Sequence, residues 1–510
     1  MSTTRAASSG IFADVTGGSV RGFTSGDLRH WRGIPYAAAP VGTLRFRAPQ
    51  PVTPWDGVRD VSRFGAISYQ SRIAPAAQQW LEPQSEDCLS INVISPRAPA
   101  AAALPVMVFI HGGAYTAGSS REIPRLGEAL VRQGDVLFVN FNYRLGALGY
   151  LDFSRFSNDK RVFDTNLGLR DQLAALRWVR DNIREFGGDP DNVTVFGESA
   201  GANAITTMLA VPAAAGLFTR AIVESAAPAA VYQSELTTQW GADYVEILRE
   251  LARNTTATAT DLLTTTDAPT LTRAASLLRQ RTPDAVPGTI AFAPVIDGDL
   301  LPQHPLDAAA EGRTHAVPLI IGTNAREGSL FRGRLDLLAS TRPRIRAVFA
   351  RTEREARRRL FDEYRALPLR TSAAQFGGDY SFWYPSIRFA EGHAQHAPVH
   401  FYRFDLATPA LRLIGLDATH GLELFAVFDL GDTVLARAGG LLGGRSEFKR
   451  AGARMRARWL SFARDGAVGE NWPTYSTAAR ETLIIDVEER VESDPHESRR
   501  VAWQAFVPHL

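Results

Sequence analysis

Short apolar runs recur along the chain and are separated by longer amphipathic or polar stretches. Uninterrupted runs rich in Val, Ile, Leu and Phe favour strands that are buried on both faces of a sheet. The runs that predict strands are 106–110, 136–140, 193–196, 319–321, 399–404 and, as a possible edge strand, 483–487. Because helical patterns lie between them, we expect an α/β fold with a large, mostly parallel central sheet flanked by helices.

Two long stretches between the strands predict helical insertions. One spans about 228–290 and includes a polar, Thr-rich part at 253–283. The other spans about 330–395 and includes 344–367, which is rich in Arg and Glu at helical spacing. We therefore expect a single domain over 1–510, in which both insertions cap the mouth of the sheet.

A serine follows the strand at 193–196 in a setting that suits a nucleophile. The motif G-E-S-A-G at 197–201 leads into 202–211, a run with Ala, Met and Leu that predicts a helix. Strand, sharp turn and helix form a nucleophile elbow, which exposes a serine at the tip of a sheet. The two glycines remove Cβ atoms that would clash with the neighbouring strand and helix. The pattern predicts Ser199 as a nucleophile.

A second glycine-containing turn follows the strand at 106–110. The segment H-G-G-A-Y at 111–115 consists mainly of small residues, so its backbone N–H groups can approach a substrate. We expect Gly113, Ala114 and Ala200 to donate to a developing oxyanion, and Gly112 to shape the turn. An ordinary glycine-rich turn is the alternative.

An acid and a base are expected in two later loops. Glu327 follows the strand at 319–321, and open α/β sheets place their chemistry at such carboxyl ends. The alternative is a solvated carboxylate paired with Arg326. His420 lies in a loop beyond the strand at 399–404, whereas His400 inside that strand is expected to pack. The order Ser199, Glu327, His420 matches the Ser…Asp/Glu…His order of α/β-hydrolases.

Composition narrows the class of protein. The 510 residues are 45% hydrophobic and 22% charged, as in ordinary globular proteins, and a net charge of +2 favours neither nucleic acid nor a membrane surface as partner. No apolar run approaches the ~20 residues of a membrane span, and 1–11 lack a signal-peptide core. Cys88 is the only cysteine, which excludes an intramolecular disulfide. We expect a cytoplasmic enzyme.

Longer motifs occur in a fixed order along nearly the whole chain. They are R-G-I-P-Y-A at 32–37, L-R-F at 44–46, S-E-D-C-L at 85–89, N-Y-R-L-G at 142–146, N-L-G-L-R-D-Q at 166–172, F-G-G-D-P at 186–190 and W-P-T-Y at 472–475. With these motifs the chain resembles the type-B carboxylesterases, a family that includes bacterial esterases, cholinesterases and liver carboxylesterases. Within the motifs, Arg45 with Glu86 and Arg144 with Asp171 are expected to form structural ion pairs.

The resemblance implies an α/β-hydrolase fold and a catalytic triad of Ser199, Glu327 and His420. It implies hydrolysis of small-molecule carboxylic esters through an acyl-serine intermediate, without a metal or organic cofactor, by a monomer or homodimer. Short- to medium-chain, aryl or bulky-alcohol esters are the expected substrates. The chain departs from the family at Ala114, where a third glycine is usual, and at Ser68, where some members carry a cysteine that pairs with the equivalent of Cys88.

Other candidate site residues have a structural alternative. Glu198, beside the nucleophile, would either be structural or tune His420 electrostatically. Several aromatic side chains could line the entrance, although core packing is an equal explanation for each. The candidates for substrate binding are Glu198, Trp80, Tyr115, Phe331, Phe382 and Trp383.

Three other functions share parts of this pattern. An amidase or carbamate hydrolase would use the same triad, and a true lipase would act at an interface. Some cholinesterase-like proteins are non-catalytic binding proteins that have lost the nucleophile or the base. The presence of all three triad candidates argues against the last of these.

Overall fold

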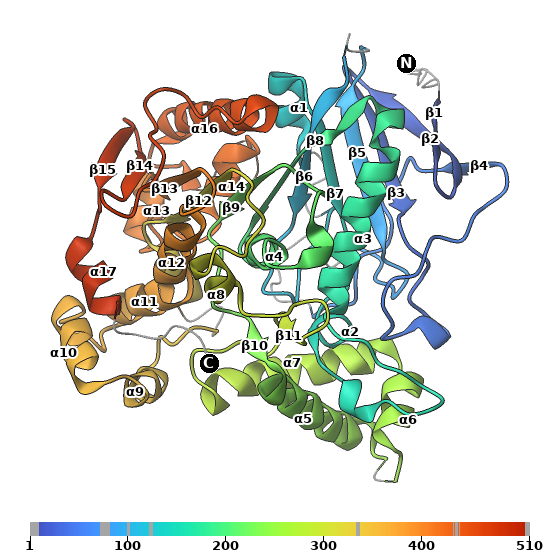
Figure 1. Cartoon of the computed structure of the whole chain (residues 1–510), viewed down its shortest axis with the longest axis horizontal. Coiled ribbons are helices and arrows are strands. Elements are labelled where there is room, and N and C mark those ends of the chain that lie inside the picture. Colours follow the sequence, from blue (N-terminus) through green and yellow to red (C-terminus); the bar gives the residue numbers. More distant parts are fainter. Residues whose placement is uncertain are drawn as a thin grey trace.

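A thirteen-stranded sheet runs through the protein (Figure 1). The computed structural model describes residues 10–71, 82–98, 102–121, 126–254, 256–332, 337–431, 433, 437 and 439–504. The strands follow the order β1-β2-β3-β5-β7-β6-β8-β9-β12-β13-β14-β15, and β4 pairs with β2. Neighbours from β7 to β14 are parallel, whereas the other neighbours in this order pair antiparallel. The strand β4 is parallel to β2.

The strands have the following bounds: β1 Ile11–Val15, β2 Gly18–Ser25, β3 Leu28–Pro35, β4 Val58–Asp60, β5 Ser90–Pro96, β6 Leu104–Ile110, β7 Leu137–Phe141, β8 Gly188–Glu198, β9 Arg220–Glu224, β12 Leu319–Asn324, β13 Val399–Phe404, β14 Glu481–Ile485 and β15 Arg490–Ser493. A separate pair joins β10 Tyr232–Gln233 to β11 Val295–Ile296.

The predicted parallel strands correspond to β6, β7, β8, β12 and β13, and the prediction of a large parallel sheet core is confirmed. Two expectations need correction. The run at 483–487 falls mostly in β14, which is not an edge strand because β15 pairs with its outer side. A further parallel strand, β9, lies between β8 and β12.

Both faces of the central strands are covered, which explains their uninterrupted apolar sequences. Along β6, Val106, Val108 and Ile110 join the apolar cluster on one face, and Met107 and Phe109 join the cluster on the other. Helices α3 and α4 contribute to the first cluster, and α1, α14 and α16 contribute to the second. The chain thus forms helix layers on both sides of the sheet (Figure 1).

The α-helices have the following bounds: α1 Glu128–Gly134, α2 Ala147–Tyr150, α3 Leu167–Asn182, α4 Ala200–Met208, α5 Ser234–Ala252, α6 Ala259–Thr265, α7 Ala268–Ala285, α8 Pro305–Ala310, α9 Arg342–Ala350, α10 Arg354–Glu363, α11 Arg370–Gly378, α12 Tyr384–His393, α13 Pro409–Leu413, α14 Leu422–Val427, α16 Arg445–Asp465 and α17 Glu497–Trp503. A 3₁₀-helical turn, Glu327–Phe331, and a π-helical turn, Asp379–Trp383, lie next to α11. No helix in these described ranges is both long and apolar enough to cross a membrane.

The two predicted insertions are helical. The first contains α5, α6 and α7, so the Thr-rich part at 253–283 does form helices. The second contains α9 to α12, and its stretch at 344–367 is divided between α9 and α10. Helix α7 contacts α9, which brings the two insertions together.

Two ion pairs join segments that are distant in sequence, one pair buried and the other half-buried. Arg144, just after β7, binds Asp171 on α3 through Nε and Nη2 at 2.8 and 2.6 Å. Arg45 binds Glu86 in the same bidentate way, at 2.8 and 2.6 Å. Both predicted structural pairs are confirmed, and the Arg144 pair is almost entirely shielded from solvent.

Removing one partner of this shielded pair should destabilise the protein strongly, because the other charge stays buried without compensation. We expect Asp171→Ala to lower the free energy of unfolding by about 3–5 kcal/mol, measured by urea denaturation. The matched control is Asp60→Ala, which breaks the exposed pair with Arg21 and should cost only about 0–1 kcal/mol. Equal effects of the two variants would contradict the prediction.

Candidate active site

Ser199 occupies a strained turn between β8 and α4. Its backbone has φ 56° and ψ −120°, a conformation that residues other than glycine rarely adopt. A Cβ on Gly201 would stand 2.0 Å from the carbonyl oxygen of Ile110 in β6, and one on Gly197 would stand 2.7 Å from the same atom. The predicted reason for both glycines is therefore confirmed: neither position has room for a side chain.

The segment 111–115 leaves β6 and passes beside this turn. A Cβ on Gly112 would lie 3.1 Å from Cβ of Ser199, so the two backbones are in close contact. Three successive residues of the segment have positive φ: 113° at Gly113, 52° at Ala114 and 55° at Tyr115. At its start, the Tyr143 hydroxyl donates to the carbonyl of His111 at 2.7 Å. The shape of this loop thus depends on contacts with its surroundings.

His420 and Glu327 contact each other from the segments that follow β13 and β12. Nδ1 of His420 donates to Oε2 of Glu327 at 2.5 Å, and the other oxygen of Glu327 accepts the N–H of Asn324 at 2.6 Å. Both side chains are buried. The loops that carry them are joined by a bond of 2.9 Å from the N–H of Arg326 to the carbonyl of Ala418.

The alternative for Glu327, a solvated carboxylate paired with Arg326, is wrong. Glu327 is only 2% exposed. The Arg326 guanidinium instead donates to the side chain of Gln375 at 2.8 Å and approaches Asp417 at 3.8 Å. Glu327 therefore uses one oxygen for His420 and the other for the backbone.

Glu198 faces the second nitrogen of His420. Oε1 of Glu198 lies 3.1 Å from Nε2, which makes no hydrogen bond within the described residues. Burial alone would lower the pKa of His420, but the charges of Glu198 and Glu327 outweigh it and raise the pKa from 6.5 to about 9. Of the two roles predicted for Glu198, this contact favours the electrostatic one.

Two more buried glutamates, Glu423 and Glu224, lie near His420 and Glu327. Neither was predicted from the sequence. Glu423 accepts the Ser225 hydroxyl at 2.7 Å and also binds the Asn324 amide. Burial, followed by the charge of Glu327, raises its pKa to about 7. Glu224 accepts from the Trp459 indole at 2.9 Å, and burial raises its pKa well above the usual range. Glu423 was detectable in principle, because it lies three residues after His420 on the helix α14 that begins there.

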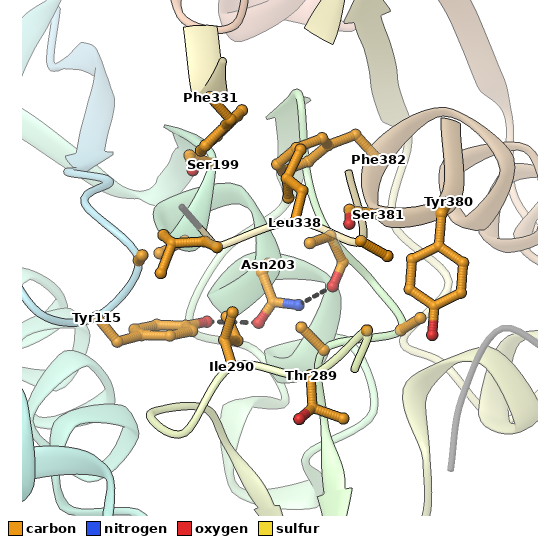
Figure 2. A pocket seen from close by; sticks show the side chains of 18 of the residues that line it. Tyr115, Ser199, Asn203, Thr289, Ile290, Phe331, Leu338, Tyr380, Ser381 and Phe382 are labelled. Atoms are coloured by element: carbon orange, nitrogen blue, oxygen red, sulfur yellow. Dashed lines mark hydrogen bonds between the residues drawn. The ribbon is translucent and has the colours of Figure 1, made fainter. Parts of the chain in front are cut away.

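A pocket opens in front of Ser199 (Figure 2). It encloses about 820 Å³ including its open mouth. Phe331 and Phe382 line it and also pack on the imidazole of His420, with ring centroids 5.3 and 4.4 Å away. The lining residues are Ala114, Tyr115, Ser199, Ala200, Asn203, Ala227, Ala229, Ala230, Tyr232, Gly288, Thr289, Ile290, Phe331, Leu337, Leu338, Ala339, Tyr380, Ser381 and Phe382.

The aromatic candidates separate into three groups. Phe331, Phe382 and Tyr115 line the pocket. Trp383 does not belong to that lining: its ring packs against His496 at 6.2 Å and lies under the Arg499 guanidinium. Its predicted place at the entrance is therefore not supported, because the preceding residue Phe382 takes the side of the helical turn that faces the pocket. Trp80 lies outside the described residues.

Four other histidines have structural contacts elsewhere. His400 packs edge-on against Trp472, as predicted for a side chain within a strand. His393 and His396 both bind the Thr314 hydroxyl, at 2.9 and 2.8 Å. His304 caps the start of α8 by accepting the N–H of Leu306. Among the described histidines, only His420 contacts both Glu327 and a residue of the elbow, Glu198.

Comparison with known proteins places these features in context. The family model described as the carboxylesterase family matches residues 9–503. A para-nitrobenzyl esterase of Bacillus subtilis is 38% identical over 95% of this chain and 96% of its own, and a fumonisin B1 esterase of Sphingopyxis macrogoltabida is 35% identical over 90% and 83%. A solved thermophilic para-nitrobenzyl esterase superposes with a TM-score of 0.86 at 36% identity, over 96% of this chain and 99% of that one.

The unusual titration of His420 can be tested without reference to any reaction. We expect the imidazole to titrate near pH 9 in the wild type, observed by NMR with labelled histidine. Glu198→Gln removes a negative charge beside Nε2, which disfavours the imidazolium, so the pKa should fall by at least about one unit. Glu185→Gln, an exposed carboxylate elsewhere, is the control and should leave it unchanged. A wild-type pKa near 6.5, or no shift in Glu198→Gln, would contradict this electrostatic account.

Proposed function

Because this chain belongs to the carboxylesterase family and is a carboxylic ester hydrolase with an α/β-hydrolase fold, we propose that Ser199, His420 and Glu327 are its catalytic triad. The observation that carries this assignment is the position of His420. One nitrogen is held by Glu327, and the other faces Glu198, the residue next to Ser199. A base in this position can reach the serine hydroxyl, although that hydrogen bond often tightens only when substrate binds.

The proposed reaction begins with proton transfer to Nε2. Since Nδ1–H is held by Glu327, Nε2 is the nitrogen that can accept the Ser199 proton while Oγ attacks the ester carbonyl carbon. The resulting imidazolium lies between the carboxylates of Glu327 and Glu198, and both stabilise its charge. The same charges also favour the imidazolium in the resting enzyme, so we expect activity to rise with pH as His420 loses its proton.

The oxyanion of the tetrahedral intermediate would be bound by backbone N–H groups. We assign this role to Gly113, Ala114 and Ala200, with Gly112 allowing the close approach of the loop. Ala114 and Ala200 line the pocket beside Ser199, and Ala200 is the first residue of α4, whose N-terminus favours negative charge. When the intermediate collapses, the carbon–oxygen bond to the alcohol breaks and His420 returns its proton to the leaving oxygen. Water then cleaves the acyl-Ser199 ester by the reverse sequence of proton transfers.

The pocket indicates the class of ester. None of the described residues that line it carries a charge, and alanines occupy several of its walls. We infer that neutral esters with short- to medium-length acyl chains, or with aryl or bulky alcohols, fit this space best. Residues from both helical insertions take part in the lining, among them Tyr232, Ile290 and Leu338. We therefore propose that the insertions at about 228–290 and 330–395 form the cap of the active site.

Ser199→Ala should abolish turnover. Without the hydroxyl no acyl-enzyme can form, so we expect kcat for p-nitrophenyl acetate and butyrate to fall by about 10⁴-fold or more. Circular dichroism and thermal melting should match the wild type, because the pocket accommodates an alanine. A folded variant with more than a tenth of wild-type kcat would refute the nucleophile assignment.

Filling the pocket should change the preferred acyl length. Ala230 lines the pocket and is partly exposed to it, so Ala230→Trp should obstruct long acyl chains more than short ones. We expect the ratio of kcat/KM for p-nitrophenyl hexanoate over acetate to drop by about tenfold or more. The control is Ala215→Trp, at an exposed position outside the lining, which should leave the ratio unchanged. An equal loss for both esters in Ala230→Trp would count against the pocket as the acyl site.

A further inference from the structure

The loop that carries the proposed oxyanion donors has a conformation that its own sequence does not favour. Ala114 and Tyr115 both have φ above +50°, a region in which a Cβ is normally unfavourable. Such a conformation persists only where surrounding contacts enforce it. Gly112, Gly113 and Ala114 have almost no side chain to make such contacts. Tyr115 is the first residue of the loop after them with a large side chain.

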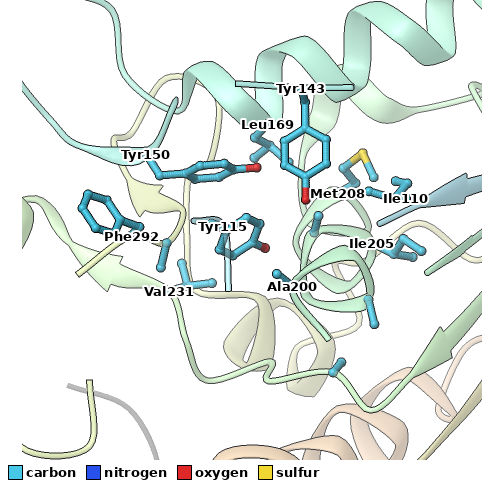
Figure 3. Close-up of a cluster of buried hydrophobic side chains, with 14 of the residues drawn as sticks. Ile110, Tyr115, Tyr143, Tyr150, Leu169, Ala200, Ile205, Met208, Val231 and Phe292 are labelled. Atoms are coloured by element: carbon cyan, nitrogen blue, oxygen red, sulfur yellow. The ribbon is translucent and has the colours of Figure 1, made fainter. Parts of the chain in front are cut away.

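The Tyr115 side chain extends away from the loop and into the interior. Its ring packs on Tyr150 with centroids 4.2 Å apart, beside Ala200 (Figure 3). Only 1% of the residue is exposed. Its hydroxyl reaches helix α4 and donates to Oδ1 of Asn203 at 2.5 Å (Figure 2). Tyr115 was predicted to bind substrate, but its only polar side-chain atom is thus committed to another side chain.

Asn203 connects this hydroxyl to two further parts of the site. It lies one turn after the nucleophile, and its N–H donates to the Ser199 carbonyl at 2.8 Å. Its amide nitrogen Nδ2 donates to the carbonyl of Ala227, on the loop after β9 that forms a wall of the pocket. One buried side chain therefore joins the oxyanion loop, the nucleophile helix and the pocket wall.

The chemistry of these partners fixes the orientation of the amide. A backbone carbonyl can only accept, so Nδ2 must face Ala227 and Oδ1 must face Tyr115. The tyrosine hydroxyl is then the donor. Asparagine meets both demands at once, whereas alanine meets neither and phenylalanine at 115 removes the donor.

We propose that Tyr115 and Asn203 are positioning residues, which hold the backbone of 113–115 where its N–H groups meet the oxyanion. This inference rests on the proposed function, because it assumes that the loop stabilises a tetrahedral intermediate. Neither side chain touches the reacting atoms. Their loss should weaken binding of the transition state while leaving binding of the neutral substrate nearly unchanged.

The test compares Tyr115→Phe, Asn203→Ala and the double variant with the wild type. We expect each single variant to lower kcat for p-nitrophenyl butyrate by about tenfold, as for loss of one buried hydrogen bond, with KM within about twofold. The inhibition constant of an alkyl trifluoromethyl ketone, which forms a tetrahedral adduct, should rise by the same factor as kcat/KM falls. Because the two residues act through one hydrogen bond, the double variant should be no slower than the slower single variant.

Tyr244→Phe is the matched control. It also removes one buried tyrosine hydroxyl, which joins α5 to α7 by donating to the carbonyl of Leu271 at 2.9 Å. Neither residue lines the pocket, so kcat and the ketone affinity should stay unchanged. Wild-type kcat in folded Tyr115→Phe and Asn203→Ala would overturn the proposal. So would a rise confined to KM, or effects of the single variants that multiply in the double variant. If either substitution prevents folding, the kcat and ketone affinity of the other decide the question.

Ser199→Ala separates this inference from the proposed function. If Ser199→Ala is inactive and Tyr115→Phe behaves as the wild type, the triad stands and only the positioning role fails. If Ser199→Ala keeps wild-type activity, the proposed function itself fails.

Discussion

The contact between β6 and the elbow is the constraint on which the site depends. The carbonyl oxygen of Ile110 lies so close to Gly201 that any side chain there would overlap it. Because the strand and the helix meet without side chains between them, the loop that continues from Ile110 runs directly past Ser199. Ser199, the proposed nucleophile, and the proposed oxyanion donors are therefore brought together by backbone packing. A larger residue at 197 or 201 would separate them.

Charge is the second constraint, since the buried surroundings of His420 hold more acids than bases. Glu198 lies beside Nε2 of His420 and Glu327 beside Nδ1. Glu423 and Glu224 are buried near enough to these glutamates for their charges to interact. Several negative charges cannot all be buried close together at little cost. The raised pKa values of Glu224 and Glu423 indicate that these acids take up protons more readily than exposed ones. The pKa of His420 is also raised, so its imidazolium provides a positive charge that compensates the remaining carboxylates. His420 thus keeps its positive charge to a higher pH than a solvated histidine does.

The sequence predicted those parts of the molecule whose local pattern is distinctive. The central strands were identifiable because both of their faces are covered and their sequences are continuously apolar. The half-exposed strand β2 and the short strand β9 carry no such signal. The elbow around Ser199 was identifiable because such a turn needs glycines at fixed positions. Contacts between distant segments, such as Tyr115 with Asn203 and Glu224 with Trp459, could not be predicted, because only the tertiary structure brings these residues together. Similarly, no local pattern shows that Phe382 faces the pocket and Trp383 does not.

The most direct test of the central claim is to identify the residue that an active-site reagent labels. A fluorophosphonate phosphonylates the nucleophile of a serine hydrolase: the serine oxygen bonds to phosphorus and fluoride leaves. Mass spectrometry of the digested protein then locates the adduct. The account predicts one adduct per chain, on Ser199, formed in proportion to the loss of ester hydrolysis. Full inactivation with the adduct on another residue, or full activity after complete labelling of Ser199, would contradict it.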